Sequence, residues 1–175
     1  MLKIIVLTII VLVAALLIYA ATRPDTFRLQ RSMTTNAPAD KVFPFINDFH
    51  HWPSWSPWEK MDLGMKKTHS GSPQGKGAVY EWDGNKDVGT GRMEVLDSIP
   101  ASKILIKLDF FKPFEAHNTA EFTLTPSAGS TQVTWAMYGP QPYIMKVMGL
   151  FCSPERMVGP QFEKGLADLK TLSEK

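Results

Sequence analysis

Two patterns of apolar and polar positions divide the chain. Residues 4–21 form an uncharged run of 18 residues, interrupted only by Thr8 and Tyr19. As an α-helix rising about 1.5 Å per residue, this run would reach roughly 27 Å, just enough to cross the hydrocarbon core of a bilayer. We therefore expect a transmembrane anchor over residues 1–23, and one soluble domain over residues 24–175.

A cleaved signal peptide is the alternative for the N-terminal run. Its charged start consists only of Lys3 and the amino terminus, and its apolar stretch exceeds the roughly 7–15 residues usual for a signal. No pair of small residues fits a cut after Ala20 or Ala21, and a cut after Thr22 would use a weak site. These features favour an uncleaved anchor. Basic residues flank both ends of the run, so the side of the membrane that carries the domain stays open.

The soluble domain opens with a strand pattern over residues 27–35. Asn36 and Pro38 then open a helix, in which Val42, Ile46 and Phe49 belong to one apolar face. A segment rich in Trp and Pro follows over residues 51–58 and predicts a loop or a short helix.

Six further strand patterns follow, with turn residues between them. They cover residues 65–70, 78–82, 89–96, 104–111, 116–125 and 131–138. Their short connections imply consecutive antiparallel strands. The chain ends in a helical pattern, with Pro154 and Pro160 predicting a break near its start. Its apolar stripe comprises Met148, Phe151, Val158, Phe162, Leu166, Leu169 and Leu172.

This order predicts an α+β helix-grip fold, in which a curved seven-stranded antiparallel sheet wraps around a long C-terminal helix. The terminal helix is the only predicted element long enough to cover the apolar face of the sheet. A strongly curved sheet around one helix leaves a space, so we expect a ligand cavity between them.

Several stretches resemble the START-like (SRPBCC) superfamily, and in particular its polyketide cyclase/dehydrase and lipid-transport branch. They are WSPW at residues 55–58, GAVYEWDGN at 77–85, GTGRME at 89–94, PFE at 113–115, VTW at 133–135 and FEKGLADLK at 162–170. The resemblance covers about residues 27–173 and implies the helix-grip fold. It implies activity less firmly, because the superfamily contains carriers, cyclases and hydrolases on one scaffold.

Alternation along the strands predicts which side chains line the cavity. In the strand over residues 116–125, Asn118 shares the apolar face, and small neighbours on that face leave room for a ligand, while His117 and Glu121 share the opposite face. The tryptophans of residues 52–58 either close one end of the grip or form a wall for an apolar ligand. The predicted lining is Trp55, Trp58, Tyr80, Trp82, Phe110, Asn118, Phe122, Trp135 and Phe162.

Candidates for catalysis are few. A cyclase or dehydrase would need an inward carboxylate or tyrosine, for which Glu81, Tyr80 and Tyr138 are the candidates. The same alternation, however, places Glu81 on the face opposite Tyr80 and Trp82. No motif for nucleophilic catalysis supports an enzyme.

The charge and the numbers of cysteines and histidines argue against several classes of partner. The formal net charge is only +2, and the one basic pair, Lys66-Lys67, is expected on a solvated strand surface, which argues against a nucleic-acid partner. Cys152 is the single cysteine, so no internal disulfide is possible. The four histidines, including adjacent His50 and His51, lack the spacing of a metal site, and we expect neither metal nor cofactor.

The predicted function is binding of a hydrophobic small molecule, lipid-like or polyketide-like, in the cavity between sheet and C-terminal helix, at a membrane reached through residues 4–21. A cyclase/dehydrase acting in the same cavity is one alternative. A partner-binding domain with a collapsed cavity is the other.

Overall fold

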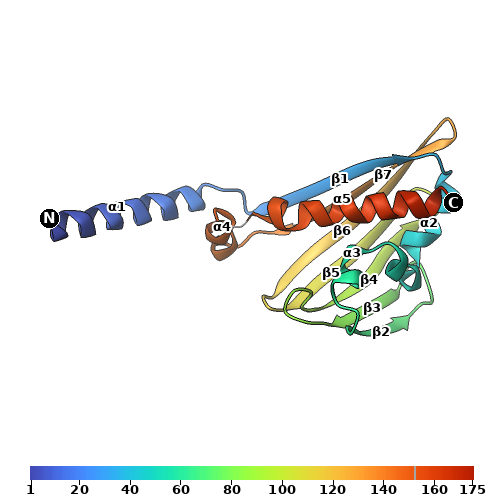
Figure 1. Ribbon diagram of the computed structural model, residues 1–175, viewed down its shortest axis with the longest axis horizontal. Helices are drawn as coiled ribbons and strands as arrows, with labels where there is room; N and C mark the ends of the chain where they lie inside the picture. The colour runs from blue at the N-terminus through green and yellow to red at the C-terminus, as the bar shows by residue number, and fades with distance from the viewer. Residues whose placement is uncertain (152) are drawn as a thin grey trace.

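The computed structural model describes residues 1–151 and 153–175, so Cys152 lies outside the described residues. Figure 1 shows an N-terminal helix that projects from a grip of strands and helices. In chain order the elements are α1 (Leu2–Ala21), β1 (Thr26–Thr35), α2 (Ala39–Asn47), the 3-10 helix η1 (Phe49–Ser54), α3 (Pro57–Met61), β2 (Lys66–Gly71), β3 (Ala78–Asp83), β4 (Thr90–Ile99), β5 (Lys103–Lys112), β6 (Ala116–Ser127), β7 (Ser130–Pro140), α4 (Tyr143–Gly149) and α5 (Pro154–Ser173).

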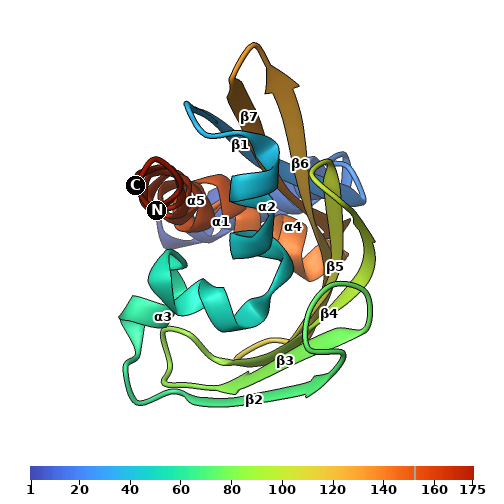
Figure 2. The ribbon, with the colours of Figure 1, turned by 90° about the vertical axis from the view of Figure 1, so that its right-hand side faces the viewer.

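The strands form one antiparallel sheet in the order β1-β7-β6-β5-β4-β3-β2. Figure 2 shows this sheet curving around the helices. Because the register aligns Leu29 with Met137, Met137 with Ala120 and Ala120 with Ile106, one face of the sheet is apolar from strand to strand. These side chains are buried. The predicted α+β fold with seven antiparallel strands is confirmed.

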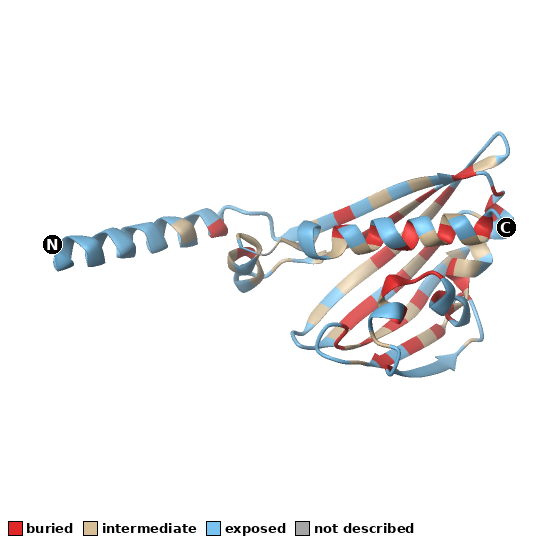
Figure 3. Ribbon diagram, in the orientation of Figure 1, coloured by how far each residue is buried: buried red, intermediate tan, exposed pale blue. Residues whose placement is uncertain are grey.

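The helices share the inner face of the sheet, which the sequence pattern assigned to the terminal helix alone. The long helix α5 contacts β1 and β7, while α2 contacts β6 and η1 contacts β3. The buried stripe of α5 consists of Phe162, Leu166 and Leu169 (Figure 3). The Trp- and Pro-rich segment therefore inserts between α5 and the lower half of the sheet, where a cavity was expected.

The C-terminal helical pattern forms two helices, and the predicted break near its start lies at Pro154, where α5 begins, and not at Pro160. The break precedes α5, where the Ser153 side chain caps the helix by accepting the Arg156 N–H, and α5 continues through Pro160. Met148 and Phe151 therefore lie outside the buried stripe of α5, and they are 38% and 71% exposed. A side-chain cap at Ser153 satisfies a free N–H of the first turn, which lets a new helix start there.

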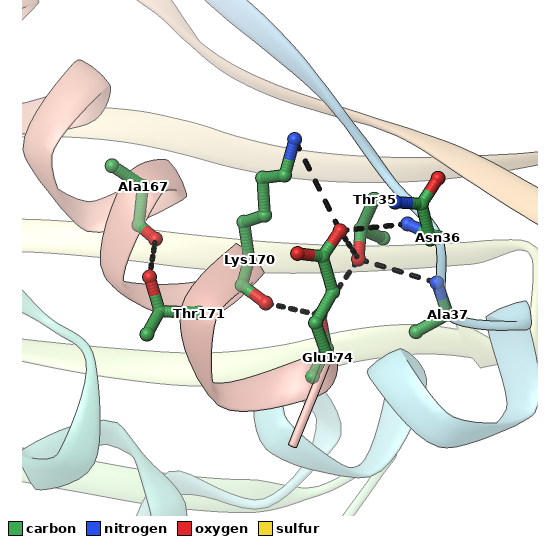
Figure 4. A network of polar contacts seen from close by, with 8 residues as sticks. Thr35, Asn36, Ala37, Ala167, Lys170, Thr171 and Glu174 are labelled. Atoms are coloured by element: carbon green, nitrogen blue, oxygen red, sulfur yellow. Dashed lines mark hydrogen bonds and ion pairs between the residues drawn. The ribbon is translucent and has the colours of Figure 1, made fainter.

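The last turn of α5 is fixed to the end of β1 and the connection that follows it by a polar network (Figure 4). The Glu174 carboxylate accepts the Asn36 N–H at 2.8 Å and the Thr35 hydroxyl at 3.2 Å. The Asn36 N–H is the main cause that lowers the pKa of Glu174. Ser173 and Thr35 share a buried hydrogen bond of 3.0 Å. This end of the grip is closed by hydrogen bonds.

The helix α1 lies apart from the grip, and its apolar side chains are exposed. It is long and apolar enough to cross a membrane, and this length and composition fit both an anchor and a signal sequence. At its C-terminal end α1 meets α4, where the Tyr143 hydroxyl donates a 3.0 Å hydrogen bond to the Leu17 carbonyl.

Candidate functional site

Six aromatic side chains pack together in the middle of the grip and are called the aromatic plug below. Its members are Trp52, Trp55, Trp58, Phe122, Trp135 and Phe162. The Trp135 ring stacks between Phe122 and Phe162, with ring centroids 4.9 and 4.0 Å away. The plug accounts for five of the nine predicted lining residues. These five face the interior, but they contact one another instead of bordering an open space.

One buried indole N–H of the plug, that of Trp135, has no hydrogen-bond acceptor among the described residues. The Trp52 indole N–H donates to the Ile46 carbonyl at 3.0 Å, and the Trp55 N–H donates to the Phe45 carbonyl at 2.8 Å. A buried donor without a partner costs about 1–3 kcal/mol, so an acceptor brought by a ligand would recover that free energy.

A second aromatic group lies across the β2–β5 side of the grip. The Trp82 ring stacks on Tyr80 at 6.0 Å and meets Phe110 edge-on at 5.7 Å. Gly91 allows this packing, because a Cβ atom there would lie 2.4 Å from the Trp82 ring. Tyr80 and Trp82 are buried and Phe110 is half-buried, so these three predicted lining residues also face inward.

A polar triad, defined here as buried Glu59 and Tyr80 with partly exposed Lys67, joins α3 to the sheet. The Tyr80 hydroxyl donates to Glu59 Oε1 at 2.6 Å, and the Lys67 ammonium pairs with Glu59 Oε2. The Glu59 side chain is only 4% exposed. Burial, and then the hydrogen bond to Glu59, raise the pKa of Tyr80, which keeps its hydroxyl protonated.

Both lysines of the basic pair are exposed, as expected for a solvated strand surface, and Lys67 in addition reaches the triad. Lys66 lies on the outer face of β2, whereas Lys67 faces inward in register with Trp82. The sequence reasoning missed Glu59 entirely. The sequence held one indication of this carboxylate, which is the period-2 alternation in β2. That alternation places Lys67 and His69 on the same face as Tyr80, where a basic side chain needs an anionic partner.

Beside the triad, His50 and His69 border a hollow of about 160 Å³ together with Phe49 and the β2–β3 turn. The two imidazole rings stack with centroids 4.2 Å apart. Burial and then the neighbouring His50 lower the pKa of His69. The Asp48 carboxylate holds His50 at 2.7 Å. Within the described ranges, no group of three or more His, Cys, Asp and Glu side chains is placed to hold a metal ion.

The inner face is less densely covered at the end where the chain enters from α1. This open end is defined by five half-buried residues, which are Phe27, Phe110, Asn118, Gly139 and Val158. A hollow of about 660 Å³ reaches it between the ends of β1 and β7. Asn118 lies closely against Gly139, where a Cβ atom would approach Asn118 Oδ1 to 2.3 Å. Asn118 is thus a half-buried polar group in an apolar lining.

Two of the three predicted candidates for catalysis, Glu81 and Tyr138, lie on the outer face of the sheet. Glu81 is exposed, and it pairs in register with Arg92 of β4. Tyr138 lies under the guanidinium of Arg28, at 4.9 Å from its ring centroid. Of the three candidates for catalysis, Tyr80 alone reaches the interior.

The fold defines a class of protein, the helix-grip domains, in which a curved antiparallel sheet wraps around helices that cover its inner face. A family model described as polyketide cyclase/dehydrase and lipid transport matches residues 26–174. The chain therefore belongs to that family. No curated protein matches the sequence significantly.

Solved structures show the same fold. Protein CV1439 from Chromobacterium violaceum is 18% identical with a TM-score of 0.60, over 87% of this chain and 99% of that one. The Zhui aromatase/cyclase from a Streptomyces species is 16% identical with a TM-score of 0.62, over 85% and 94% of the two chains. The di-domain aromatase/cyclase StfQ from the steffimycin pathway is 13% identical with a TM-score of 0.63, over 85% of this chain and 51% of that one.

Proposed function

We propose that this protein binds a hydrophobic small molecule, lipid-like or polyketide-like, inside the grip, while α1 holds it in a membrane. The unpartnered indole N–H of Trp135 carries this proposal. It is a buried donor in a lining of aromatic rings, which is the pattern of a site that orients an apolar ligand through few polar contacts. Family membership supports the same class of ligand.

The route to Trp135 leads from the open end. Between the plug and the strand ends the inner face carries Ala120, Asn118 and Gly139, with the buried side chain of Met137 opposite Ala120. A ligand that enters here would contact Phe110 and Asn118 first and would reach Trp135 once a plug ring turns aside. Its burial would contribute about 25 cal/mol per Å² of apolar surface.

The membrane is the natural source of such a ligand. A molecule that partitions into lipid is scarce in water, so a binding site fixed at the bilayer meets it at a far higher local concentration. The helix α1 supplies the fixation, and the linker after it leads directly into β1 beside the open end.

Native mass spectrometry of the full chain, released from detergent micelles after exposure to a membrane lipid extract, tests the proposal. We expect a defined mass excess over the denatured chain. Trp135→Phe should weaken retention of the ligand about tenfold, the equivalent of one hydrogen bond. Trp52→Phe is the matched control, because its N–H already has an acceptor. A wild-type chain that stays free of ligand would contradict the proposal.

A cyclase-type activity is the second candidate, and the polar triad favours it. A protonated Tyr80 and a buried Glu59 form a donor–acceptor pair inside the grip. Both Glu59 oxygens are engaged, so proton transfer to a substrate requires that Lys67 or Tyr80 first release Glu59. Loss of product formation in Glu59→Gln with ligand retention unchanged would establish this activity over simple binding.

A further inference from the structure

Exposed apolar side chains gather at the end of the grip that faces α1. Ile144 of α4 and Phe151 after it are 63% and 71% exposed, and Phe114 in the β5–β6 connection is 59% exposed. Met148 and Phe111 are exposed beside them. A soluble surface rarely leaves so many large apolar groups in water at one end, which marks a contact surface.

The sheet register places the β5–β6 connection at the end of the sheet where β1 begins and β7 ends. Phe110 pairs with Ala116, so the β5–β6 connection turns at the same end of the sheet where Thr26 pairs with Pro140. That end receives the chain from α1 and passes it on to α4. Figure 1 shows α4 and the β5–β6 turn on the side of the grip from which α1 projects.

One hydrogen bond sets the depth of α4. Tyr143 donates to the carbonyl of Leu17, which lies four residues, or about 6 Å along the axis, before α1 ends at Ala21. If residues 4–21 span the hydrocarbon core, Leu17 lies just inside its boundary. The helix α4 then lies at the level where acyl chains meet headgroups.

An ion pair between a buried lysine and an exposed carboxylate, that of Asp25 at 95% exposure, holds α4 in this place. The Lys146 ammonium pairs with the Asp25 carboxylate at 2.6 Å, and the Lys146 side chain is only 6% exposed. The Gln141 N–H also donates to the Asp25 carbonyl at 2.7 Å. With Lys146 turned inward, α4 presents Ile144 and Met148 to its surroundings.

We infer that α4, Phe151 and the Phe111–Phe114 turn form a second membrane contact, which inserts into the interface of the bilayer that α1 spans. This surface, the lipid-facing end, rests on the proposed anchor. It continues the apolar surface of α1, and the charged groups near it in the chain are of both signs, with exposed Arg23 and Lys112 and exposed carboxylates on Asp25 and Glu115. The contact seats the open end of the grip on the membrane, so that a lipid-soluble ligand passes from bilayer to Asn118 without crossing water.

Depth-dependent fluorescence quenching tests the inference. The full chain, with Cys152→Ser as background, receives one cysteine at Ile144, Phe114, Ile10 or Ser127 and an environment-sensitive NBD label. It is placed in nanodiscs of phosphatidylcholine and phosphatidylglycerol that carry nitroxide lipids. Ile10 lies in the proposed span, and Ser127 lies at the opposite end of the sheet in the β6–β7 turn.

We expect nitroxides near the headgroups to reduce emission at least about twofold at Ile144 and Phe114, and by less than about a tenth at Ser127. Quenching at Ile10 without quenching at Ile144 and Phe114 would overturn the inference and leave the anchor standing. No quenching at Ile10 would overturn the anchor and the inference with it. Blue-shifted emission at Ile144 that nitroxides do not quench would show a protein surface covering this end, which also overturns the inference.

Discussion

Replacing Glu59 by alanine removes the acceptor of the polar triad. The Tyr80 hydroxyl is then buried without a partner, which costs about 1–3 kcal/mol. The Lys67 side chain is 28% exposed and can turn to water. The free energy lost by breaking its ion pair with Glu59 is therefore well below the roughly 3–5 kcal/mol typical of a broken buried ion pair. We expect Glu59→Ala to lower the free energy of unfolding by about 2–4 kcal/mol, or Tm by about 5–15 °C.

Thermal unfolding followed by tryptophan fluorescence measures this change in the full chain in detergent, because all five tryptophans lie in residues 24–175. Lys60→Ala is the matched control. It breaks the exposed Lys60–Asp168 pair of the same helix α3, which should change stability by less than about 1 kcal/mol. Equal losses in Glu59→Ala and Lys60→Ala would refute the reasoning that the triad is a buried clamp.

Three further substitutions test the local environments. Because burial lowers the pKa of His69, the unfolded chain binds its proton more tightly, so stability should fall as pH drops through about 6.5, and His69→Gln should flatten that fall in urea titrations. The Asp109 carboxylate raises the pKa of His117, so His117→Gln should lose stability in acid and not at high pH, and the opposite pattern would contradict the assignment. Gly91→Ala should cost about 1–3 kcal/mol in the same titrations, because its methyl would meet the Trp82 ring and the Asp109 carbonyl, and a neutral effect would contradict this close packing.

Strand patterns predicted the fold well because a half-buried strand repeats every two residues. Asn118, Phe122 and Tyr80 face inward as alternation requires. The break in the C-terminal helix was predicted from its prolines, but the exposure of Met148 and Phe151 was not, since both continue the apolar period of α5 across the break. Whether such a residue is buried depends on what lies opposite it, and here no part of the sheet does.

The polar part of the interior escaped sequence reasoning for a related reason. Glu59 meets Lys67 and Tyr80 from positions 8 and 21 residues away, a pairing that depends on how α3 docks on the sheet. The lack of a partner for the Trp135 indole likewise depends on every neighbour in the fold. The tryptophans themselves were predicted to be structural or ligand-binding, and their packing supports a structural role for Trp52 and Trp55.

The most direct test of ligand binding inside the grip is photocrosslinking with a diazirine-bearing fatty acid, applied to the full chain in nanodiscs and mapped by peptide mass spectrometry. The account predicts adducts on the inner face, around Phe110, Asn118 and Trp135, that an excess of unlabelled membrane lipid suppresses. Adducts confined to residues 4–21 and 143–151 would show that lipid contacts the protein only from outside, and would contradict the account.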